Sequence, residues 1–393
     1  VGSMRIALFT ETYLPQINGV VTHVKTLKDG LERLGHEVMV VTADSSTSRH
    51  YLQGDVLYCP ATRLKRLYNY CAALPISNTR LRYIRRFNPD VIHIHTEFGV
   101  GISGVVAAKI LHKPLVYTLH TMYDEYIYYI VPNSMVWATT KFSHRYIKFI
   151  ANRAQALTGP SEKCTRYFES VGITGRPVHV VPNAVEQDTY NPQNANPEKT
   201  AQIRRELGYS PEDMVICFVG RLGKEKSVDV LLEAWAENIR PEERIRLLVI
   251  GGGPFYEPYR ELAQKLGIQE MVTFTGAVPH DQLPPYYAAC DAYATASLSD
   301  TCSISMLEGM ATGLPVFQRK DPINADQVRD GVNGFNFESG RQLADQLRAF
   351  RAMDPAEKEV LRASVIQSVR ESGAERLAGC LVEIYQNVLA GKR

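Results

Sequence analysis

Short runs of apolar, mostly β-branched residues alternate with helical patterns of apolar and polar positions along the whole chain. This alternation is typical of parallel β-sheets covered by helices on both faces. The strands predicted in the first half are residues 5–9, 38–42, 56–59, 91–95, 115–120, 156–159 and 178–182. Those predicted in the second half are residues 215–220, 246–250, 272–274, 292–296, 315–318 and 334–337. The pattern therefore predicts an α/β protein with two doubly wound, Rossmann-like domains, in which ligands bind at the carboxyl ends of the strands.

Domain boundaries follow from breaks in this pattern. A polar stretch rich in proline and asparagine, residues 191–197, separates the two series and predicts a linker. The helical pattern of residues 20–34 stops at Gly35, a residue that commonly caps helices, and residues 342–389 are helical by pattern. We therefore expect an N-terminal domain at 4–190, a linker at 191–210 and a C-terminal domain at 211–375. A last helix, 376–393, is expected to pack back on the N-terminal domain. Residues 1–3 precede Met4 and are expected to be a cloning remnant.

Composition narrows the class of protein. The chain has 393 residues, 45% of them hydrophobic and 22% charged, which is typical of soluble globular proteins. It has no run of 18 apolar residues, so no membrane-spanning helix is expected. Its seven cysteines are scattered without a C-x-x-C pair, which argues against a zinc site or a disulfide framework and for a cytoplasmic protein.

The net charge of +2 conceals an asymmetry between the two halves. Residues 1–190 hold 21 Lys and Arg against 14 Asp and Glu, whereas the remainder holds 23 against 28. The basic first half either meets an anionic surface or a phosphorylated ligand, or reflects ordinary variation between domains.

Two loops of the second half have residues suited to a phosphorylated ligand. The predicted strand 215–220 leads into a loop with Arg221 and Lys226, and two cations five residues apart can converge on a diphosphate. The next strand ends in three glycines, 251–253, against which a nucleobase or ribose can lie. Each loop by itself has an ordinary interpretation, a solvated surface loop in the first case and a tight turn in the second.

The segment 297–316 carries the strongest signal. A strand stops at Ser297, small polar residues follow, and a helix is predicted to begin near Ser303. The N–H groups and dipole of a helix start favour phosphate. Asp300 and Glu308 lie eight positions apart, one in the loop and one two turns into the helix, so they can face different hydroxyl-rich parts of one ligand. Taken alone, Asp300 is more simply a helix N-cap and Glu308 an ordinary helix carboxylate.

Together, these motifs resemble the retaining, family-4 glycosyltransferases of the GT-B fold, in which two Rossmann-like domains face each other across a cleft. The resemblance rests on the Arg–Lys spacing and on the two acids before G-M-A-T-G-L-P-V at residues 309–316, and it covers essentially the whole chain. It implies an N-terminal acceptor domain and a C-terminal domain that binds a nucleotide-sugar. Arg221 and Lys226 would bind the donor diphosphate, Asp300 the sugar and Glu308 the ribose. The β-phosphate would lie on the backbone of Thr301, Cys302, Ser303 and Ile304, and the base near Gly253 and Val278.

One position departs from the family pattern. The first acid is usually glutamate, whereas Asp300 is one methylene shorter and would reach the sugar less directly or through water.

The first half contributes a second group of candidates. The strand 5–9 leads to Gly19 and Val20 at a predicted helix start, and the resemblance implies that this loop faces the donor. His120 ends another strand; a single histidine there is more often structural. The T-L-H-T motif at 118–121 and the tyrosines that follow it resemble the bacterial glycosyltransferases that glucosylate diacylglycerol, which implies that His120 lies beside the anomeric carbon. Acceptor-site candidates are Glu97, Tyr126 and Tyr129, the tyrosines being equally compatible with core stacking.

Two segments mix basic and aromatic residues, 63–87 and 141–153. This composition suits an anionic membrane interface, and it is equally typical of a solvated helix face. No recognition motif for nucleic acid accompanies it. A lipid acceptor is preferred because of the tyrosine-rich segment and the basic first half, with a soluble or polysaccharide acceptor as the alternative.

The resemblance implies a retaining hexosyltransferase, with UDP-glucose preferred because the enzymes that this chain resembles use it. The protein is expected to be peripheral on the inner face of the membrane. The catalytic candidates are His120 and Asp300. The chain has no D-x-D triplet, so no metal bridge to the donor and no tightly bound cofactor are expected. A GT-B-fold nucleotide-sugar epimerase and a protein that only senses nucleotide-sugar remain the alternatives.

Overall fold

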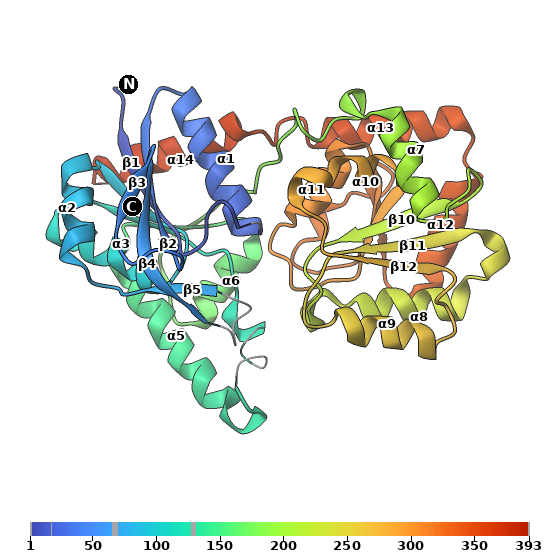
Figure 1. Ribbon diagram of the computed structural model, residues 1–393, viewed down its shortest axis with the longest axis horizontal. Coiled ribbons are helices and arrows are strands. Elements are labelled where there is room, and N and C mark those ends of the chain that lie inside the picture. Colours follow the sequence, from blue (N-terminus) through green and yellow to red (C-terminus); the bar gives the residue numbers. More distant parts are fainter. Residues whose placement is uncertain (1, 17, 65–69, 126, 128–130, 392–393) are drawn as a thin grey trace. The chain divides into compact units, whose positions relative to one another are not determined.

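The computed structural model describes residues 2–16, 18–64, 70–125, 127 and 131–391, which form two compact units (Figure 1). Unit 1 comprises Val1–Ala184 and Ala374–Arg393, and unit 2 comprises Val185–Gly373. The chain therefore passes from one unit to the other twice. The first passage comes six residues before the boundary expected at position 190.

Unit 1 is built on one twisted sheet with the strand order β3-β4-β2-β1-β6-β7-β8-β9, and β5 pairs with β4. All pairings are parallel except those of β3 and β5 with β4. The strands are β1 (Arg5–Phe9), β2 (Glu37–Asp44), β3 (Tyr51–Gln53), β4 (Val56–Leu64), β5 (Tyr70–Ala73), β6 (Val91–Ile94), β7 (Leu115–Thr118), β8 (Ala156–Gly159) and β9 (Val178–Val180). The sequence pattern missed β3 and β5 because short antiparallel strands at an edge need no continuous apolar run.

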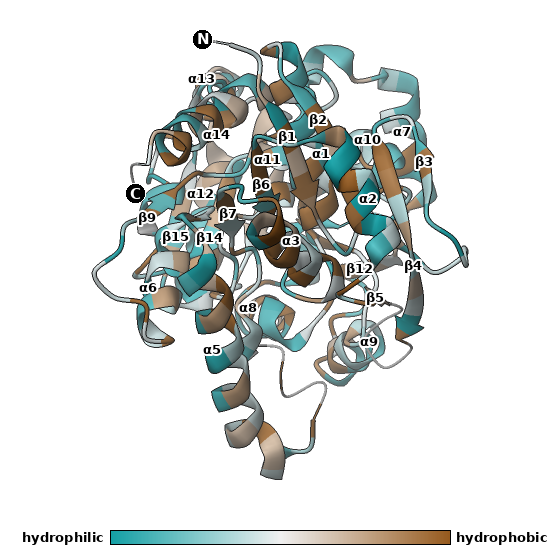
Figure 2. Ribbon diagram, turned by 90° about the vertical axis from the view of Figure 1, so that its left-hand side faces the viewer, coloured by the Kyte–Doolittle hydropathy of each residue, from teal (hydrophilic) through white to brown (hydrophobic). Residues whose placement is uncertain are grey.

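The helices of unit 1 are α1 (Gly19–Arg33), α2 (Asn78–Phe87), α3 (Gly99–Ile110), α5 (Val136–Arg153), α6 (Glu162–Ser170) and α14 (Ala374–Leu389). Helix α1 begins where Asn18 Oδ1 accepts the N–H of Val21 at 2.9 Å, and Gly35 follows its end at a φ of 90°. The predicted helix and its glycine cap are confirmed to within one residue at either end. Figure 2 shows α3 brown over most of its length, in keeping with its burial against the sheet.

Helix α14 completes the core of unit 1, although it is the last helix in the chain. Leu377, Leu381 and Tyr385 are buried in one cluster with Leu27 and Leu31 of α1. A side chain at Gly30 would lie 2.3 Å from the backbone oxygen of Ala374, so the glycine lets the two helices approach closely.

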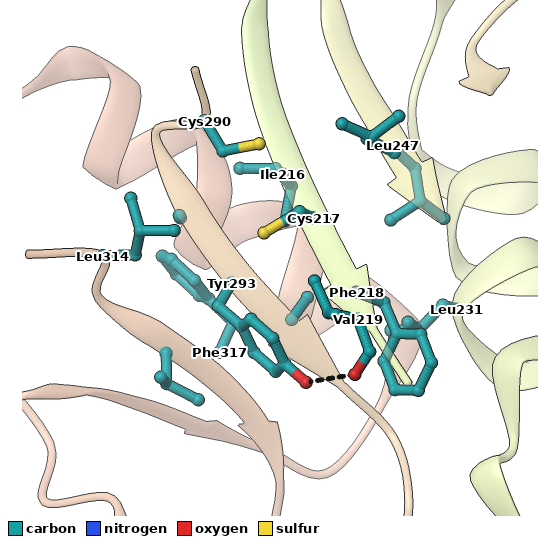
Figure 3. Close-up of a cluster of buried hydrophobic side chains, with 14 of the residues drawn as sticks. Ile216, Cys217, Phe218, Val219, Leu231, Leu247, Cys290, Tyr293, Leu314 and Phe317 are labelled. Carbon is teal, nitrogen blue, oxygen red and sulfur yellow. Dashed lines mark hydrogen bonds between the residues drawn. The ribbon is translucent and has the colours of Figure 1, made fainter. Parts of the chain in front are cut away.

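Unit 2 has a six-stranded, wholly parallel sheet in the order β12-β11-β10-β13-β14-β15. Its strands are β10 (Met214–Val219), β11 (Ile245–Ile250), β12 (Val272–Gly276), β13 (Ala292–Thr295), β14 (Val316–Arg319) and β15 (Gly334–Phe337). Every residue of β10 is buried, because helices cover both faces of the sheet. Figure 3 shows this core, in which the Tyr293 hydroxyl donates to the carbonyl oxygen of Val219 at 3.0 Å.

The helices of unit 2 are α7 (Pro197–Glu206), α8 (Val228–Asn238), α9 (Tyr256–Lys265), α10 (Pro284–Ala288), α11 (Ile304–Ala311), α12 (Gly340–Ala352) and α13 (Pro355–Ser368). The segment 191–210, expected to be a linker, instead carries α7 and belongs to unit 2. Asn196 caps this helix, and Arg204 on it donates to the backbone oxygens of Ala289, Ser210 and Asp213. These bonds hold α7 against the unit.

None of the helices within the described residues is both long and apolar enough to cross a bilayer.

Candidate active site

The loop after β10 holds two cationic side chains at the carboxyl end of the unit 2 sheet. Arg221 follows the strand by two residues, and Lys226 ends the 3-10 helix η5 (Lys224–Lys226). Lys226 Nζ lies 2.5 Å from Asp300 Oδ1, with 19% and 24% of the two side chains exposed. The Arg221 guanidinium lies 3.4 Å from the buried carboxylate of Glu225. The parallel sheet thus brings the predicted lysine and the predicted first acid into one ion pair.

Side chains hold the carbonyl oxygens of the loop between β13 and α11. Asn324 Nδ2 donates to the backbone oxygens of Asp300 and Thr301, at 3.0 and 3.1 Å, and Gln327 Nε2 donates to that of Thr301 at 3.0 Å. Helix α11 then begins, with Ser303 Oγ accepting the N–H of Met306. Since the carbonyls are already bonded and first-turn N–H groups have no partner within a helix, this start suits an anionic oxygen. Asn324 and Gln327 were missed because only their place after the end of β14 marked them in the sequence.

Three further hydrogen bonds join this loop and the start of α11 to the end of β10 and the loop after it. The hydroxyls of Ser297 and Ser299 donate to the backbone oxygen of Glu225, and Ser305 Oγ donates to that of Val219. The two predicted donor segments therefore form one hydrogen-bonded body at the edge of the sheet.

Glu308 lies on α11 and is only 3% exposed. Its Oε1 accepts the Tyr287 hydroxyl at 3.0 Å, and its Oε2 lies 2.8 Å from His280 Nε2. The same His280 nitrogen lies 3.1 Å from the Tyr190 hydroxyl. Burial, with the Glu308 charge second, raises the pKa of Tyr287 well above 10, so its hydroxyl stays a proton donor. His280 and the two tyrosines were missed, although His280 follows the end of β12, where a ligand-facing residue is expected.

The glycines after β11 have a backbone role. Gly251 and Gly253 both have a φ of 144°, and a Cβ at these positions would lie 1.8 Å from the backbone oxygen of Gly220 and 2.6 Å from that of Leu222. These glycines therefore form a turn with positive φ, as the ordinary interpretation has it. They also lie in close contact with the loop after β10 that holds Arg221 and Lys226, the cationic loop. Val278 is partly buried against the core of unit 2.

Gly19 and Val20 begin α1 in unit 1. Gly19 is exposed, and a Cβ built there would meet no atom within 4 Å. The fold itself therefore does not require glycine at this position.

Four histidines gather in unit 1 at the ends of α1, β6 and β7. His120 Nε2 lies 3.0 Å from His95 Nδ1, and the ring centroids of His120 and His23 are 4.5 Å apart. His93 bonds to the hydroxyls of Tyr385 and Thr118, at 2.5 and 2.6 Å. Burial lowers the pKa of His23 to about 4 and lowers the pKa of His93, His95 and His120 well below 6.5, so the rings are neutral at pH 7. Only His120 was singled out in the sequence.

Glu97 lies just beyond β6 and is buried. Its carboxylate accepts hydroxyl hydrogen bonds from Tyr117, at 2.7 Å, and from Tyr123. Burial raises the pKa of Glu97 to about 7, against the lowering effect of the two tyrosines. Glu97 thus anchors the start of the tyrosine-rich segment, whose Tyr126 and Tyr129 lie outside the described residues.

The lowered pKa values of the buried histidines predict that unit 1 loses stability in acid. A buried histidine with a lowered pKa costs stability as the pH falls below 6.5, since the unfolded chain then binds more protons. Glu97 and Glu11, whose pKa burial also raises to about 7, act in the opposite direction between pH 4.5 and 7. With four histidines against two glutamates, we expect the unfolding free energy to fall by up to about 3 kcal/mol per pH unit between pH 6.5 and 4.5.

Urea unfolding at pH 7 and pH 5.5 measures this effect. His23→Gln should reduce the pH dependence, whereas His144→Gln, which removes a histidine outside the cluster, should not. Equal unfolding free energies at the two pH values would contradict the prediction.

Comparison with known proteins identifies the class of protein to which this fold and this site belong. The family model of glycosyl transferases group 1 matches residues 199–364, and that of glycosyltransferase family 4 matches residues 17–189. The chain belongs to the family-4, group 1 glycosyltransferases of the GT-B fold.

Among similar proteins are two alpha-monoglucosyldiacylglycerol synthases. That of Acholeplasma laidlawii is 30% identical over 353 residues, which cover 88% of this chain and 87% of that protein. That of Streptococcus pneumoniae (strain ATCC BAA-255 / R6) is 28% identical over 341 residues, which cover 87% of this chain and 77% of that protein. The crystal structure of Anabaena HepE in complex with UDP and glucose has the same fold, with a TM-score of 0.75 at 19% identity over 98% of this chain and 100% of that chain. The predicted family and the α/β fold class are therefore confirmed.

Proposed function

We propose that this glycosyltransferase is a retaining hexosyltransferase that moves glucose from UDP-glucose to a hydroxyl of a membrane lipid such as diacylglycerol or a glycolipid. The observation that carries the proposal is the joined pair of loops in unit 2, where Arg221, the Lys226–Asp300 pair and the start of α11 share one edge of the sheet. The two similar alpha-monoglucosyldiacylglycerol synthases support the lipid acceptor, and the ligands of the HepE structure support the donor.

The donor is bound by unit 2 in this proposal. Arg221 and Lys226 neutralise the diphosphate, and the backbone of Thr301, Cys302, Ser303 and Ile304 receives the β-phosphate. Glu308 takes the ribose hydroxyls, with Tyr287 and His280 holding its carboxylate in place. The base lies near Gly253 and Val278.

In this proposal, Asp300 contacts both Lys226 and the donor sugar. Its 2.5 Å pair with Lys226 orients the lysine, and its partial exposure leaves room for a sugar hydroxyl or a bridging water. We assign the remaining contacts with the donor to Gly19, Val20 and His120 of unit 1. The open space at Gly19 supports this role.

Transfer breaks the bond between the anomeric carbon and the diphosphate oxygen and forms a bond to the acceptor oxygen. The acceptor proton passes to the departing diphosphate, whose charge Arg221, Lys226 and the start of α11 stabilise. We propose that Glu97, Tyr126 and Tyr129 contribute to the acceptor site. Glu97 would act indirectly, by anchoring the start of the tyrosine-rich segment.

Exposed apolar side chains on α5 and just before it suit a membrane surface. Trp137 and Phe142 are 71% and 70% exposed, and Met135 and Phe149 are exposed as well. Lys141 Nζ lies 4.1 Å from the Trp137 ring centroid. Exposed aromatics beside cations insert at the headgroup level of anionic bilayers, so we propose that the protein is cytoplasmic and peripheral, docking through 141–153 and the basic segment 63–87.

The double variant Trp137→Ala/Phe142→Ala should bind anionic vesicles at least about tenfold more weakly, since each ring loses more than about 1 kcal/mol of apolar burial. Co-sedimentation with phosphatidylglycerol vesicles measures this partition, with phosphatidylcholine vesicles as the neutral comparison. Val360→Ala, at an apolar side chain of α13 that is 72% exposed, is the matched control. Unchanged pelleting of the double variant would contradict docking through α5.

A donor screen tests the proposed function as a whole. UDP-, GDP- and ADP-hexoses are incubated with vesicles that contain diacylglycerol, and nucleotide release and lipid-linked sugar are measured. UDP-glucose should be consumed only with acceptor, the product should keep the anomeric configuration, and Arg221→Ala should lose activity. Binding or turnover of none of the donors would overturn the proposal, and isomerised nucleotide-sugar without acceptor would identify an epimerase instead.

A further inference from the structure

Three of the four clustered histidines have the arrangement of a metal site. Within the described residues, His23, His95 and His120 each offer one ring nitrogen, and these nitrogens all lie within 4.8 Å of one another. They come from α1, from the end of β6 and from the end of β7, so the fold of unit 1 itself assembles them.

Two ring nitrogens in this cluster have no hydrogen-bond partner among the residues that the structure describes. His23 is 4% and His95 is 1% exposed, and the Nε2 atom of each is buried without a partner. His23 Nδ1 lies 2.9 Å from Asn183 Oδ1, which accepts only, so the ring proton is on Nδ1 and the unpartnered Nε2 carries a lone pair. A histidine that donates its other N–H to a carbonyl oxygen is the usual form of a metal ligand. A buried polar atom without a partner otherwise lowers the stability of the fold.

The ligand chemistry selects the ion. Neutral imidazoles suit zinc, copper and nickel, whereas magnesium and calcium require oxygen ligands. Zinc–nitrogen bonds of about 2.0–2.1 Å place tetrahedral ligand nitrogens about 3.3 Å apart, so the farthest pair must approach by up to about 1.5 Å. His120 is the least buried of the three, so we expect its ring to make this movement.

The positive charge near the cluster limits the affinity. The Arg376 guanidinium lies close enough to His23 to lower its pKa, and it bonds to the backbone oxygens of Pro182 and Asn183. This cation opposes a bound metal ion and favours reversible binding over a permanent structural site.

We propose that His23, His95 and His120 bind one divalent transition-metal cation such as Zn²⁺, with a water molecule as the fourth ligand. All three ligands belong to unit 1 and none comes from the loops of unit 2, so metal binding does not depend on the proposed function. If His120 also contacts the donor sugar, as that function requires, the metal ion inhibits transfer.

A cobalt titration tests the site. The chelator-treated chain, free of any histidine tag, is titrated with Co²⁺, and tetrahedral visible absorption should saturate at one equivalent and disappear on addition of Zn²⁺ but not Mg²⁺. Since loss of an outer-shell partner costs 10–100-fold in metal affinity, His23→Gln, which removes a ligand, should weaken binding by more than about 100-fold. His144→Gln, a histidine paired with Asp124 outside the cluster, is the matched control and should bind normally.

A second measurement needs no variant. Zinc X-ray absorption of the wild-type chain should show three imidazole nitrogens at about 2.0 Å and one further light ligand. Absence of a saturable site in the micromolar range, or binding that survives both His23→Gln and His95→Gln, would overturn the proposal. Metal binding without any sugar transfer would leave the site standing and refute only the proposed function.

Discussion

Lys226→Met is expected to lower kcat/KM for sugar transfer by about 10²–10³-fold. Methionine keeps much of the side-chain length but removes the charge that the departing diphosphate requires. It also leaves Asp300 without the cation 2.5 Å from its carboxylate, so the proposed sugar contact loses its orientation. Because the phosphate charge grows as the bond breaks, most of the loss should fall on kcat. Steady-state kinetics with UDP-glucose and diacylglycerol vesicles measures the effect.

Lys224→Met is the matched control for this variant. Lys224 lies in the same short helix and is exposed, two positions before Lys226, so it tests whether general loss of positive charge in the loop matters. We expect its kcat/KM to stay within a few-fold of the wild-type value. Equal losses of kcat/KM in the two variants would refute a specific role for Lys226. If the unfolding free energy of Lys226→Met falls together with its activity, the loss would instead reflect a collapsed loop.

Gly251→Ala is expected to destabilise unit 2 by roughly 3–5 kcal/mol, the combined cost of backbone strain and overpacking. The residue has a φ of 144°, a conformation that L side chains rarely adopt, and its new methyl group would lie 1.8 Å from the backbone oxygen of Gly220. That oxygen belongs to the cationic loop, so the variant should also displace Arg221 and weaken donor binding. Urea unfolding and UDP affinity measure the two effects.

The neighbouring glycine provides the control. A Cβ at Gly252 would meet the Ala277 side chain at 3.4 Å, an ordinary contact, and the residue has no positive φ. Gly252→Ala should therefore change the unfolding free energy by less than about 1 kcal/mol. If the two alanine variants are equally stable, the close approach between the loops does not determine the stability of this edge.

The strands of both sheets were predictable because parallel strands that are covered on both faces consist of continuous apolar runs. β10, with all its residues buried, is an example. The segment 191–210 was misjudged because α7 has a single buried residue, Ile203, and therefore little apolar pattern. Its place in unit 2 depends on Arg204, whose bonds reach backbone oxygens up to 85 positions away.

The candidate site divides in the same way. Arg221, Asp300 and Glu308 could be found from spacing, because Arg221 shares one short segment with Lys226 and Asp300 shares another with Glu308. Asn324, Gln327 and His280 could not, because each acts on a residue more than 20 positions away and has no motif of its own.

The sequence by itself determined two α/β units, the family and the residues suited to a donor diphosphate, because these depend on local period and spacing. Only the tertiary structure decided which of them meet. Strand order sets Lys226 against Asp300 across 74 positions. It also brings His95 and His120 together after β6 and β7, where α1 contributes His23. The physical reason is that side-by-side parallel strands end at a common edge, so residues that are distant along the chain become neighbours there.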